Sequence, residues 1–229
     1  MNLEKNILTI KENIATSAIK AGREACDITL VAVTKTIDHG FLNNNINTFI
    51  KNGITNFGEN RVQELVEKHP HISNQINWHM IGTLQRNKVK YLPGKIIMIH
   101  SLDNLKLAQE ISKIGEKAGV VFDVLIEINI AGEDSKHGIH PKDMIQLAAD
   151  AVVLPSINIK GLMTIAPYVS DPNKNRAHFK RMYELYCQLG DVEGIEPSTL
   201  SMGMTNDYGV AIEEGATVVR VGTGIFGER

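Results

Sequence analysis

Hydrophobic and polar residues alternate along the chain in two different rhythms. Short runs of β-branched and aliphatic residues predict strands, and longer stretches with apolar residues every three or four positions predict helices. The predicted strands span residues 29–34, 56–58, 77–82, 96–100, 122–130, 159–165, 199–202 and 217–222. The clearest predicted helices span residues 3–25, 103–118, 141–153 and 172–189. A proline at position 141 suits the first turn of the third helix.

This order of elements predicts an α/β fold with a parallel sheet, because parallel neighbours need a crossover connection between them. Eight such units in 229 residues fit the size of a closed (β/α)₈ TIM barrel, preceded by one extra N-terminal helix. A doubly wound open sheet is the alternative. No Gly-x-Gly-x-x-Gly motif follows the first strand, which argues against a dinucleotide-binding version of that fold. We expect one domain over residues 1–229.

Composition narrows the class of protein. The chain is 43% hydrophobic with a net charge of −2, so bulk electrostatics do not favour binding to nucleic acid or to a membrane surface. Cys26 and Cys187 have neither paired nor metal-type spacing, and we expect no disulfide and no metal site. The N-terminus lacks a secretory pattern, and no stretch reaches the ~20 apolar residues of a spanning helix. We expect a cytoplasmic protein.

Lys35 stands at the end of the first predicted strand. Side chains alternate along a strand, so Val31, Val33 and Lys35 share one face. An ammonium at the end of such an apolar row is poorly hydrated, which favours the neutral amine that a Schiff base with an aldehyde requires. Taken alone, a lysine at a strand end more often extends into solvent.

Two short turns with glycine and hydroxyl residues follow the last two strands, at residues 201–205 and 222–224. Glycine lets the backbone approach an anion closely, and barrels bind phosphate after strands 7 and 8. The alternative is a pair of ordinary tight turns. Arg220 shares a strand face with Gly222. If that face points inward, the guanidinium needs an acceptor, such as a phosphate, a ring nitrogen or a structural carboxylate.

Other polar residues lie near the ends of the second and third strands. Asn60 and His79 can each hydrogen-bond a ligand oxygen. The alternatives are a helix N-cap for Asn60 and a hydrogen-bonded core histidine for His79. Residues 132–138 form a charged loop, either a lid or a solvated connection. Pyridoxal 5′-phosphate has an aldehyde and a phosphate on one ring, so it would join Lys35 to the two turns.

Six segments carry a family resemblance: VAVTKT, FGENRVQE, WHMIGTLQRNK, IHSLDN, KGLMTIAP and the run from LSMGMTNDYG to the C-terminus. Together they resemble the pyridoxal phosphate homeostasis proteins (the YggS/PROSC family), whose fold is similar to the barrel domain of bacterial alanine racemase and the fold type III decarboxylases. The resemblance implies an internal aldimine on Lys35. It also implies a cofactor site that includes Asn60, His79, Met163, Ser201, Met202, Arg220, Gly222 and Thr223.

Within that site, the resemblance assigns the phosphate to Ser201, Gly222 and Thr223, and the ring to Asn60, His79 and Met163, which the same motifs contain. Arg220 is expected near the ring nitrogen or the phosphate. Thr205 replaces a serine that is usual in the motif, which keeps the hydroxyl.

Three functions remain open at this stage. The first is a cofactor carrier that buffers pyridoxal phosphate and passes it to apo-enzymes without robust catalysis, as a monomer or weak dimer. The second is a fold type III racemase or lyase, and the third is an enzyme acting on a phosphorylated sugar. The chain ends at Arg229, so we expect no second domain with the opposite proton donor that racemisation needs. A cation at the ring nitrogen would also weaken the ring as an electron sink. Both points favour the carrier.

Overall fold

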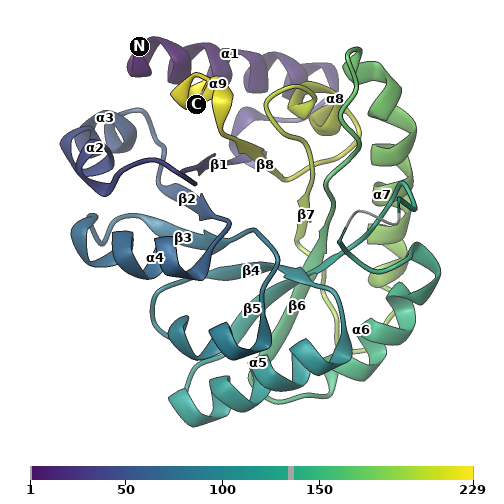
Figure 1. The fold of residues 1–229 in the computed structure, drawn as a ribbon. Helices are drawn as coiled ribbons and strands as arrows, with labels where there is room; N and C mark the ends of the chain where they lie inside the picture. Colours follow the sequence, from purple (N-terminus) through teal and green to yellow (C-terminus); the bar gives the residue numbers. More distant parts are fainter. Residues whose placement is uncertain (1, 134–136, 229) are drawn as a thin grey trace.

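Eight parallel strands form a closed barrel in the order β1 to β8 in this computed structural model, which describes residues 2–133 and 137–228. Helices surround the strands on the outside (Figure 1). The strands are β1 (Thr29–Val33), β2 (Asn56–Glu59), β3 (Asn77–Met80), β4 (Met98–Leu102), β5 (Phe122–Glu127), β6 (Ile157–Met163), β7 (Thr199–Ser201) and β8 (Val218–Val221). The predicted TIM barrel is therefore confirmed, and the open sheet is excluded.

The helices confirm the predicted alternation. The α-helices are α1 (Leu3–Lys20), α2 (His39–Asn44), α3 (Ile46–Lys51), α4 (Val62–Lys68), α5 (Leu105–Ala118), α6 (Met144–Val152), α7 (Arg176–Leu189), α8 (Tyr208–Glu213) and α9 (Thr223–Phe226). Short 3₁₀ turns are η1 (Ala25–Asp27), η2 (His69–His71), η3 (Arg86–Tyr91), η4 (Pro141–Asp143) and η5 (Pro172–Asn175). The first turns of two predicted helices are the 3₁₀ turns η4 and η5, each of which begins with a proline and continues into an α-helix, as is frequent at helix termini.

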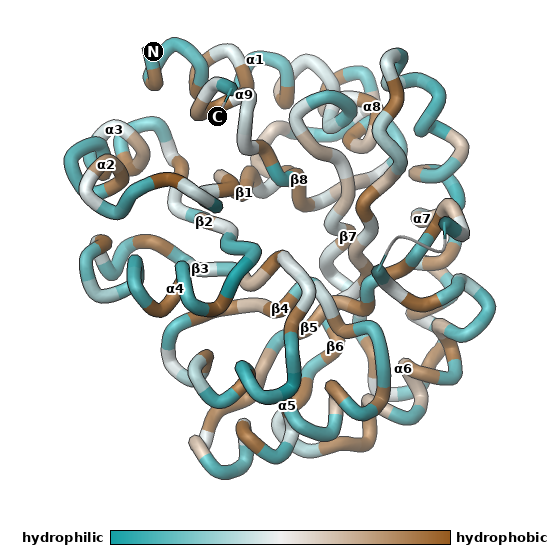
Figure 2. The backbone as a smooth tube through the Cα atoms, in the orientation of Figure 1, coloured by the Kyte–Doolittle hydropathy of each residue, from teal (hydrophilic) through white to brown (hydrophobic). Residues whose placement is uncertain are grey.

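Alternation along β1 separates two sets of side chains, as predicted. Leu30 and Ala32 belong to the hydrophobic core shared with the surrounding helices. Val31 and Val33 are buried but lie outside that shared core, because they face the interior of the barrel. Figure 2 shows hydrophobic and hydrophilic residues alternating along the helices, as expected when one face packs on the barrel and the other faces water.

The N-terminal helix α1 packs beside the C-terminal end of the chain (Figure 1). Its buried face includes Ile7, Ile10 and Ile14, spaced by three and four residues. Two long-range hydrogen bonds fix it there, from Asn6 Nδ2 to the carbonyl of Ile225 at 3.0 Å and from Asn13 Nδ2 to the hydroxyl of Tyr208 at 3.1 Å. The helix therefore supports α8 and α9, which follow the two glycine turns.

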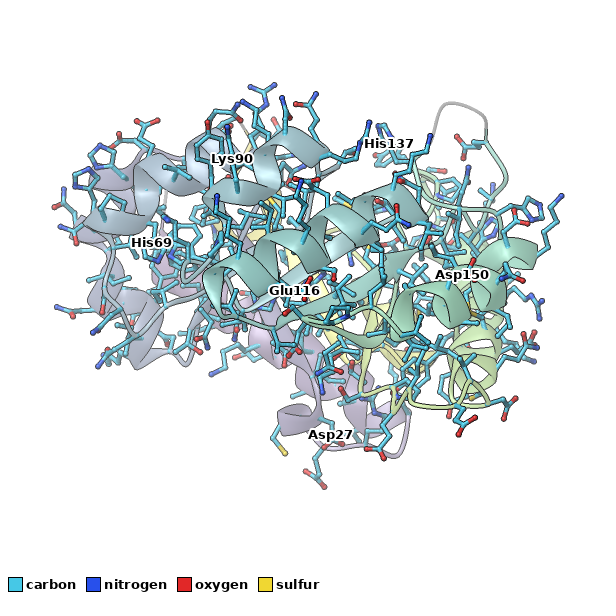
Figure 3. All side chains as sticks on the ribbon, turned by 90° about the horizontal axis from the view of Figure 1, so that it is seen from below. Asp27, His69, Lys90, Glu116, His137 and Asp150 are labelled. Atoms are coloured by element: carbon cyan, nitrogen blue, oxygen red, sulfur yellow. The ribbon has the colours of Figure 1, made fainter. Side chains whose placement is uncertain are left out.

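The two ends of the barrel differ in what they carry. Figure 3 labels Asp27, just before β1, at the opposite end from His137, in the loop after β5. The end with His137 is the mouth, where loops leave the carboxyl ends of the strands. Part of the predicted charged loop, residues 134–136, lies outside the described residues.

Three other sequence expectations concern cysteines, membranes and metals. Both cysteines are exposed free thiols. Within the described ranges, no helix is long and apolar enough to cross a membrane. Over the same part of the chain, no group of three His, Cys, Asp or Glu residues is placed to hold a metal ion.

Candidate functional site

A cavity of about 480 Å³ lies at the mouth of the barrel, within the usual size range of ligand pockets. Its wall combines the end of β1 with the loops that follow β6, β7 and β8. The lining residues are Val33, Lys35, Ile165, Ala166, Pro167, Tyr168, Met204, Thr205, Asn206, Asp207, Gly222 and Thr223. The structure thus brings Lys35 and both glycine turns to one cavity.

Lys35 lies two residues beyond the end of β1, in a turn rather than in the strand. Its side chain is on the same face as Val33, as predicted, and both line the cavity. The residue is nevertheless exposed. The expectation of an amine shielded from water by an apolar row is therefore wrong, because the strand ends before the lysine and the cavity is open to solvent.

The two glycine turns are in direct contact. The hydroxyl oxygen of Thr205 accepts a hydrogen bond from the backbone N–H of Gly224 at 3.3 Å and lies 3.2 Å from the hydroxyl of Thr223. Below them, the backbone N–H of Arg220 donates to the carbonyl of Gly203 at 3.0 Å. These bonds join the loop after β7 to the start of α9, which follows β8.

Asp207 holds the first of these turns in shape. Its Oδ1 accepts from the backbone N–H of Met204 at 2.8 Å, and its Oδ2 accepts from Asn175 Nδ2, also at 2.8 Å. The same Asn175 amide donates to the carbonyl of Pro167 at 2.9 Å. One buried asparagine therefore joins the loop after β6 to the loop after β7, and so joins two walls of the cavity.

A chain of buried polar side chains crosses the barrel interior. The guanidinium of Arg220 donates to Ser201 Oγ and to the carbonyl of Thr164, the latter at 2.7 Å. Ser201 Oγ is 3.1 Å from His100 Nδ1, and His100 Nε2 is 2.9 Å from His79 Nδ1. The last side chain in this hydrogen-bonded series is Asn56, whose Oδ1 is 3.1 Å from His79 Nε2.

The direction of these hydrogen bonds follows from the guanidinium, which can only donate. Ser201 accepts from Arg220, so its own hydroxyl donates to His100 Nδ1, and His100 Nε2–H then donates to His79. Both imidazoles are neutral in this arrangement. Burial lowers the pKa of His79 to about 4. Burial, with the nearby charges of His79 and Arg220, puts the pKa of His100 well below its ordinary value.

Arg220 remains a cation at neutral pH. Burial lowers its pKa to about 10, and the negative charges of Glu127 and Asp207 oppose that shift. Its hydrogen-bond acceptors are a hydroxyl and a main-chain carbonyl, rather than the structural carboxylate considered from sequence. The arginine therefore supplies a fixed positive charge beneath the mouth.

The remaining predicted site residues lie away from the cavity wall. Lys35, Gly222 and Thr223 line the cavity, and the other six do not. Ser201, His79 and Arg220 belong to the buried polar chain, so His79 has the hydrogen-bonded core environment considered as its alternative.

The last three occupy different surroundings. Met163, at the end of β6, is buried beside its register partner Glu127. Met202 packs in the outer core between barrel and helices. Asn60 follows β2 with its main chain packed against Gly82.

Sequence reasoning did not single out His100, Thr164, Asn175, Asp207 or Glu127. His100 lay inside a predicted strand and Asp207 followed a glycine turn, so each carried a weak signal. Glu127 interrupts an apolar strand at a position that faces inward, and burial raises its pKa to about 7, with the charge of Asp103 adding to the effect.

The fold and site define a class: a parallel barrel with a lysine after strand 1 and paired glycine turns after strands 7 and 8. The family model "Alanine racemase, N-terminal domain" matches residues 6–229. An alanine racemase of Clostridium difficile 630 has the same fold at a TM-score of 0.76 and 17% identity, over 98% of this chain and 57% of that one.

Relatives of higher identity are the same length as this chain. A protein of Aquifex aeolicus (strain VF5), named pyridoxal phosphate homeostasis protein, is 42% identical over 100% of this chain and 99% of its own length. PipY of Synechococcus elongatus PCC7942, solved with PLP bound, has a TM-score of 0.84 and 27% identity, covering 99% of this chain and 100% of that one. The chain belongs to the pyridoxal phosphate homeostasis protein family.

Proposed function

We propose that this protein binds pyridoxal 5′-phosphate and serves in its homeostasis, as a carrier that holds the reactive aldehyde and passes it to apo-enzymes. The observation that carries this proposal is the single cavity that contains both Lys35 and the two glycine turns. PipY, which was solved with PLP bound, has a closely similar fold, and the relatives named for pyridoxal phosphate homeostasis match over the full chain.

The residues at the mouth fit this cofactor. When bound, it supplies an aldehyde carbon to which a lysine amine can attach with loss of water. Lys35 is a lysine with its side chain in the cavity. We propose that the Lys35 amine attaches to the aldehyde carbon, while the rest of the cavity orients the ring.

We propose that Gly222 and Thr223 hold the phosphate together with Thr205. The first turn of a helix has amides without partners inside the helix, and these suit an anion. A Cβ added to Gly224 would come within 3.1 Å of Thr205 Cγ2 and 2.9 Å of Val221 Cγ1. The same Cβ would lie 3.0 Å from Ile10 Cδ1 on α1, so the turn packs too closely against its surroundings to accept a side chain at this position.

We propose an indirect role for Ser201 and His79. Both belong to the buried chain that fixes Arg220, which is positive at neutral pH. A fixed cation beneath the mouth favours an anionic ligand. Asn60, Met163 and Met202 are proposed to shape the barrel end around the ring rather than to contact the phosphate.

Robust catalysis is not part of this proposal. Among the residues that the structure describes, three titratable side chains line the cavity: Lys35, Tyr168 and Asp207. Asp207 has both carboxylate oxygens engaged by Met204 and Asn175. Tyr168 is 88% exposed, so it is not held in position for proton transfer. A racemase or lyase remains the competing function.

Covalent labelling tests the proposal. The protein is mixed with pyridoxal phosphate, treated with borohydride to make any attachment permanent, and digested for mass spectrometry. We expect one label, on Lys35, and a yellow protein before reduction. Lys35→Ala should lose both, whereas Lys113→Ala, an exposed lysine on α5, should keep them. Unchanged binding by the Lys35→Ala variant would defeat the assignment.

Two further measurements separate the carrier from an enzyme. Loaded protein is incubated with an apo-aminotransferase, and regained transaminase activity reports delivery. Loaded protein is also incubated with each L-amino acid, and the D-isomer is quantified. Delivery without the D-isomer supports a carrier. Turnover at an enzymatic rate of about 1–10³ s⁻¹ would make the carrier proposal wrong.

A further inference from the structure

A buried ion-pair cluster lies behind the turn that carries Lys35. Lys68 Nζ, at the end of α4, is 2.7 Å from Glu59 Oε1 and 3.3 Å from Glu64 Oε2. The side chains of Lys68 and Glu59 are 6% and 0% exposed. Charged side chains are almost never so deeply buried unless they are paired, and removing one partner leaves an uncompensated buried charge.

Every member of this cluster bonds the backbone or side chain of a residue next to Lys35. Lys68 Nζ donates to the carbonyl of Thr34 at 2.8 Å, and the Thr34 hydroxyl donates to Glu59 Oε1 at 2.6 Å. On the other side, the backbone N–H of Thr36 donates to Glu64 Oε2 at 2.8 Å. The residues before and after the lysine are therefore both held by the same three charges.

The turn itself is strained. Thr36 has φ of 63°, in the left-handed region that a β-branched residue rarely adopts. Such a conformation persists only when surrounding contacts impose it, and the bond to Glu64 is one of them. Thr34 is fully buried while Lys35 is exposed, so the cluster fixes the base of the lysine and leaves its amine in the cavity.

One carboxylate oxygen of the cluster lacks a hydrogen bond among the described residues. Glu59 Oε2 is buried and has no hydrogen-bond partner among the described residues. Burial raises the pKa of Glu59, and its bonds to Lys68 and Thr34 oppose that shift. A purely structural pair would be expected to satisfy both oxygens or to be replaced by apolar residues. Fold stability alone therefore does not account for the arrangement.

We propose that Lys68, Glu59 and Glu64 are positioning residues that fix the backbone on both sides of Lys35, so that its amine meets an aldehyde bound at the glycine turns. This inference rests on the proposed function, because it concerns how the lysine is presented to that ligand. The aldehyde and the phosphate are attached to one rigid ring, so the protein must contact them at two fixed points at the same time. If the backbone at Lys35 shifted, the protein would still bind the phosphate of the ligand at the glycine turns. The Lys35 amine would, however, attach to the aldehyde more slowly.

Two variants test this. Glu59→Gln with Lys68→Met removes the buried charges together, which avoids leaving one of them unpaired. Glu64→Ala removes the acceptor of the Thr36 amide and the more distant of the two carboxylates that face Lys68, while the Glu59–Lys68 pair stays intact. The Glu64 side chain is 22% exposed, so folding should persist. The control is Arg176→Met on α7, which removes a cation that also bonds two carboxylates, at 2.7 and 2.6 Å, far along the chain from Lys35.

The readouts separate attachment from binding. The rate of borohydride-trapped label on Lys35 should fall about tenfold or more in both cluster variants. Total pyridoxal phosphate retained in equilibrium dialysis should fall much less, and Arg176→Met should match the wild type in both. In ligand-free protein, hydrogen exchange at the Thr36 amide should be faster in Glu64→Ala than in wild type. It should be unchanged in the control Arg176→Met.

Folded cluster variants that label Lys35 at the wild-type rate would overturn the positioning role while leaving the proposed function standing. A wild-type protein without label on Lys35 would overturn both. Equal losses in attachment and in retained ligand would also contradict positioning, since that pattern indicates a damaged cavity.

Discussion

Glu127 provides a pH-dependent test of the barrel interior. It ends β5 with its side chain facing inward, is 5% exposed, and its Oε2 has no hydrogen-bond partner among the described residues. Burial, with the charge of Asp103, raises its pKa from 4.5 to about 7, and Arg220 opposes the shift. The folded protein therefore holds a proton at Glu127 that the unfolded chain releases at much lower pH.

The sign and size of the effect follow from linkage. A carboxyl whose pKa is raised on folding stabilises the fold fully below its unfolded value of 4.5, and that contribution is lost as pH rises through about 7. Each pKa unit corresponds to about 1.4 kcal/mol. The stability contributed by Glu127 should therefore fall by about 2–3 kcal/mol between pH 5 and pH 8.5.

Urea unfolding of wild type and Glu127→Gln at both pH values measures this contribution. The difference between the two proteins cancels every other titrating group. We expect the variant to gain about 2–3 kcal/mol relative to wild type on going from pH 5 to pH 8.5. Glu116→Gln, at an exposed site on α5 (Figure 3), should show no such gain. A difference that stays constant with pH would refute the buried, proton-holding carboxyl.

Three other predictions concern the polar chain and the turns. Ser201→Ala removes a buried hydroxyl bonded to a guanidinium and should lower the free energy of unfolding, measured in urea, by about 1.5–3 kcal/mol. Thr16→Ala, at an exposed site, should change it by no more than about 0.5 kcal/mol. Equal effects of the two substitutions would argue against the buried row of hydrogen-bonded side chains. Gly224→Ala puts a methyl 3.1 Å from Thr205 Cγ2 and should weaken pyridoxal phosphate binding about tenfold by titration; unchanged affinity would place the phosphate elsewhere. Burial lowers the pKa of His79 from 6.5 to about 4, so its contribution, present above 6.5, is lost as pH falls through 4. The advantage of wild type over His79→Gln in urea should shrink accordingly, and a constant advantage would contradict a neutral buried imidazole.

The sequence was sufficient to predict the barrel, and it placed Lys35 and the two glycine turns at the same end of it. Strand alternation placed Val33 and Lys35 on one face, and the parallel topology placed the turns after β7 and β8 together. Both inferences use local periodicity and a general rule about barrels, which do not depend on side-chain packing. The eight strands were found within a few residues of their observed ends.

The register between neighbouring strands could not be read in the same way. The fourth strand was predicted to end at His100, but β4 continues to Leu102, and the pairing of β4 with β5 contains a register shift. The contact between His79 and His100 depends on the register of β3 with β4, in which His79 pairs with Met98 and Met80 pairs with Ile99. Packing between distant segments sets it, so two histidines that looked unrelated in sequence form one hydrogen-bonded pair.

Long-range bonds account for the other missed features. Asn175 joins Pro167 to Asp207 across loops that are far apart in sequence, and Lys68 reaches back to Thr34. Each residue has an ordinary role in a local pattern, such as a helix end or a turn. Only the closed barrel brings these positions together, which is why propensity and spacing do not reveal them.

The barrel separates the buried charge of Arg220 from Lys35, whose amine we propose attaches the aldehyde. Arg220 is buried, positive at neutral pH and held by two acceptors. Lys35 and Thr223 are exposed at an open mouth. Enzymes of this chemistry gain from excluding water around the reacting atoms, whereas a carrier must exchange its cargo with solvent or with another protein. A buried cation beneath an exposed lysine at an open mouth suits the second task, which supports the proposed carrier. Because the interior need not open for exchange, detachment from Lys35 should limit delivery.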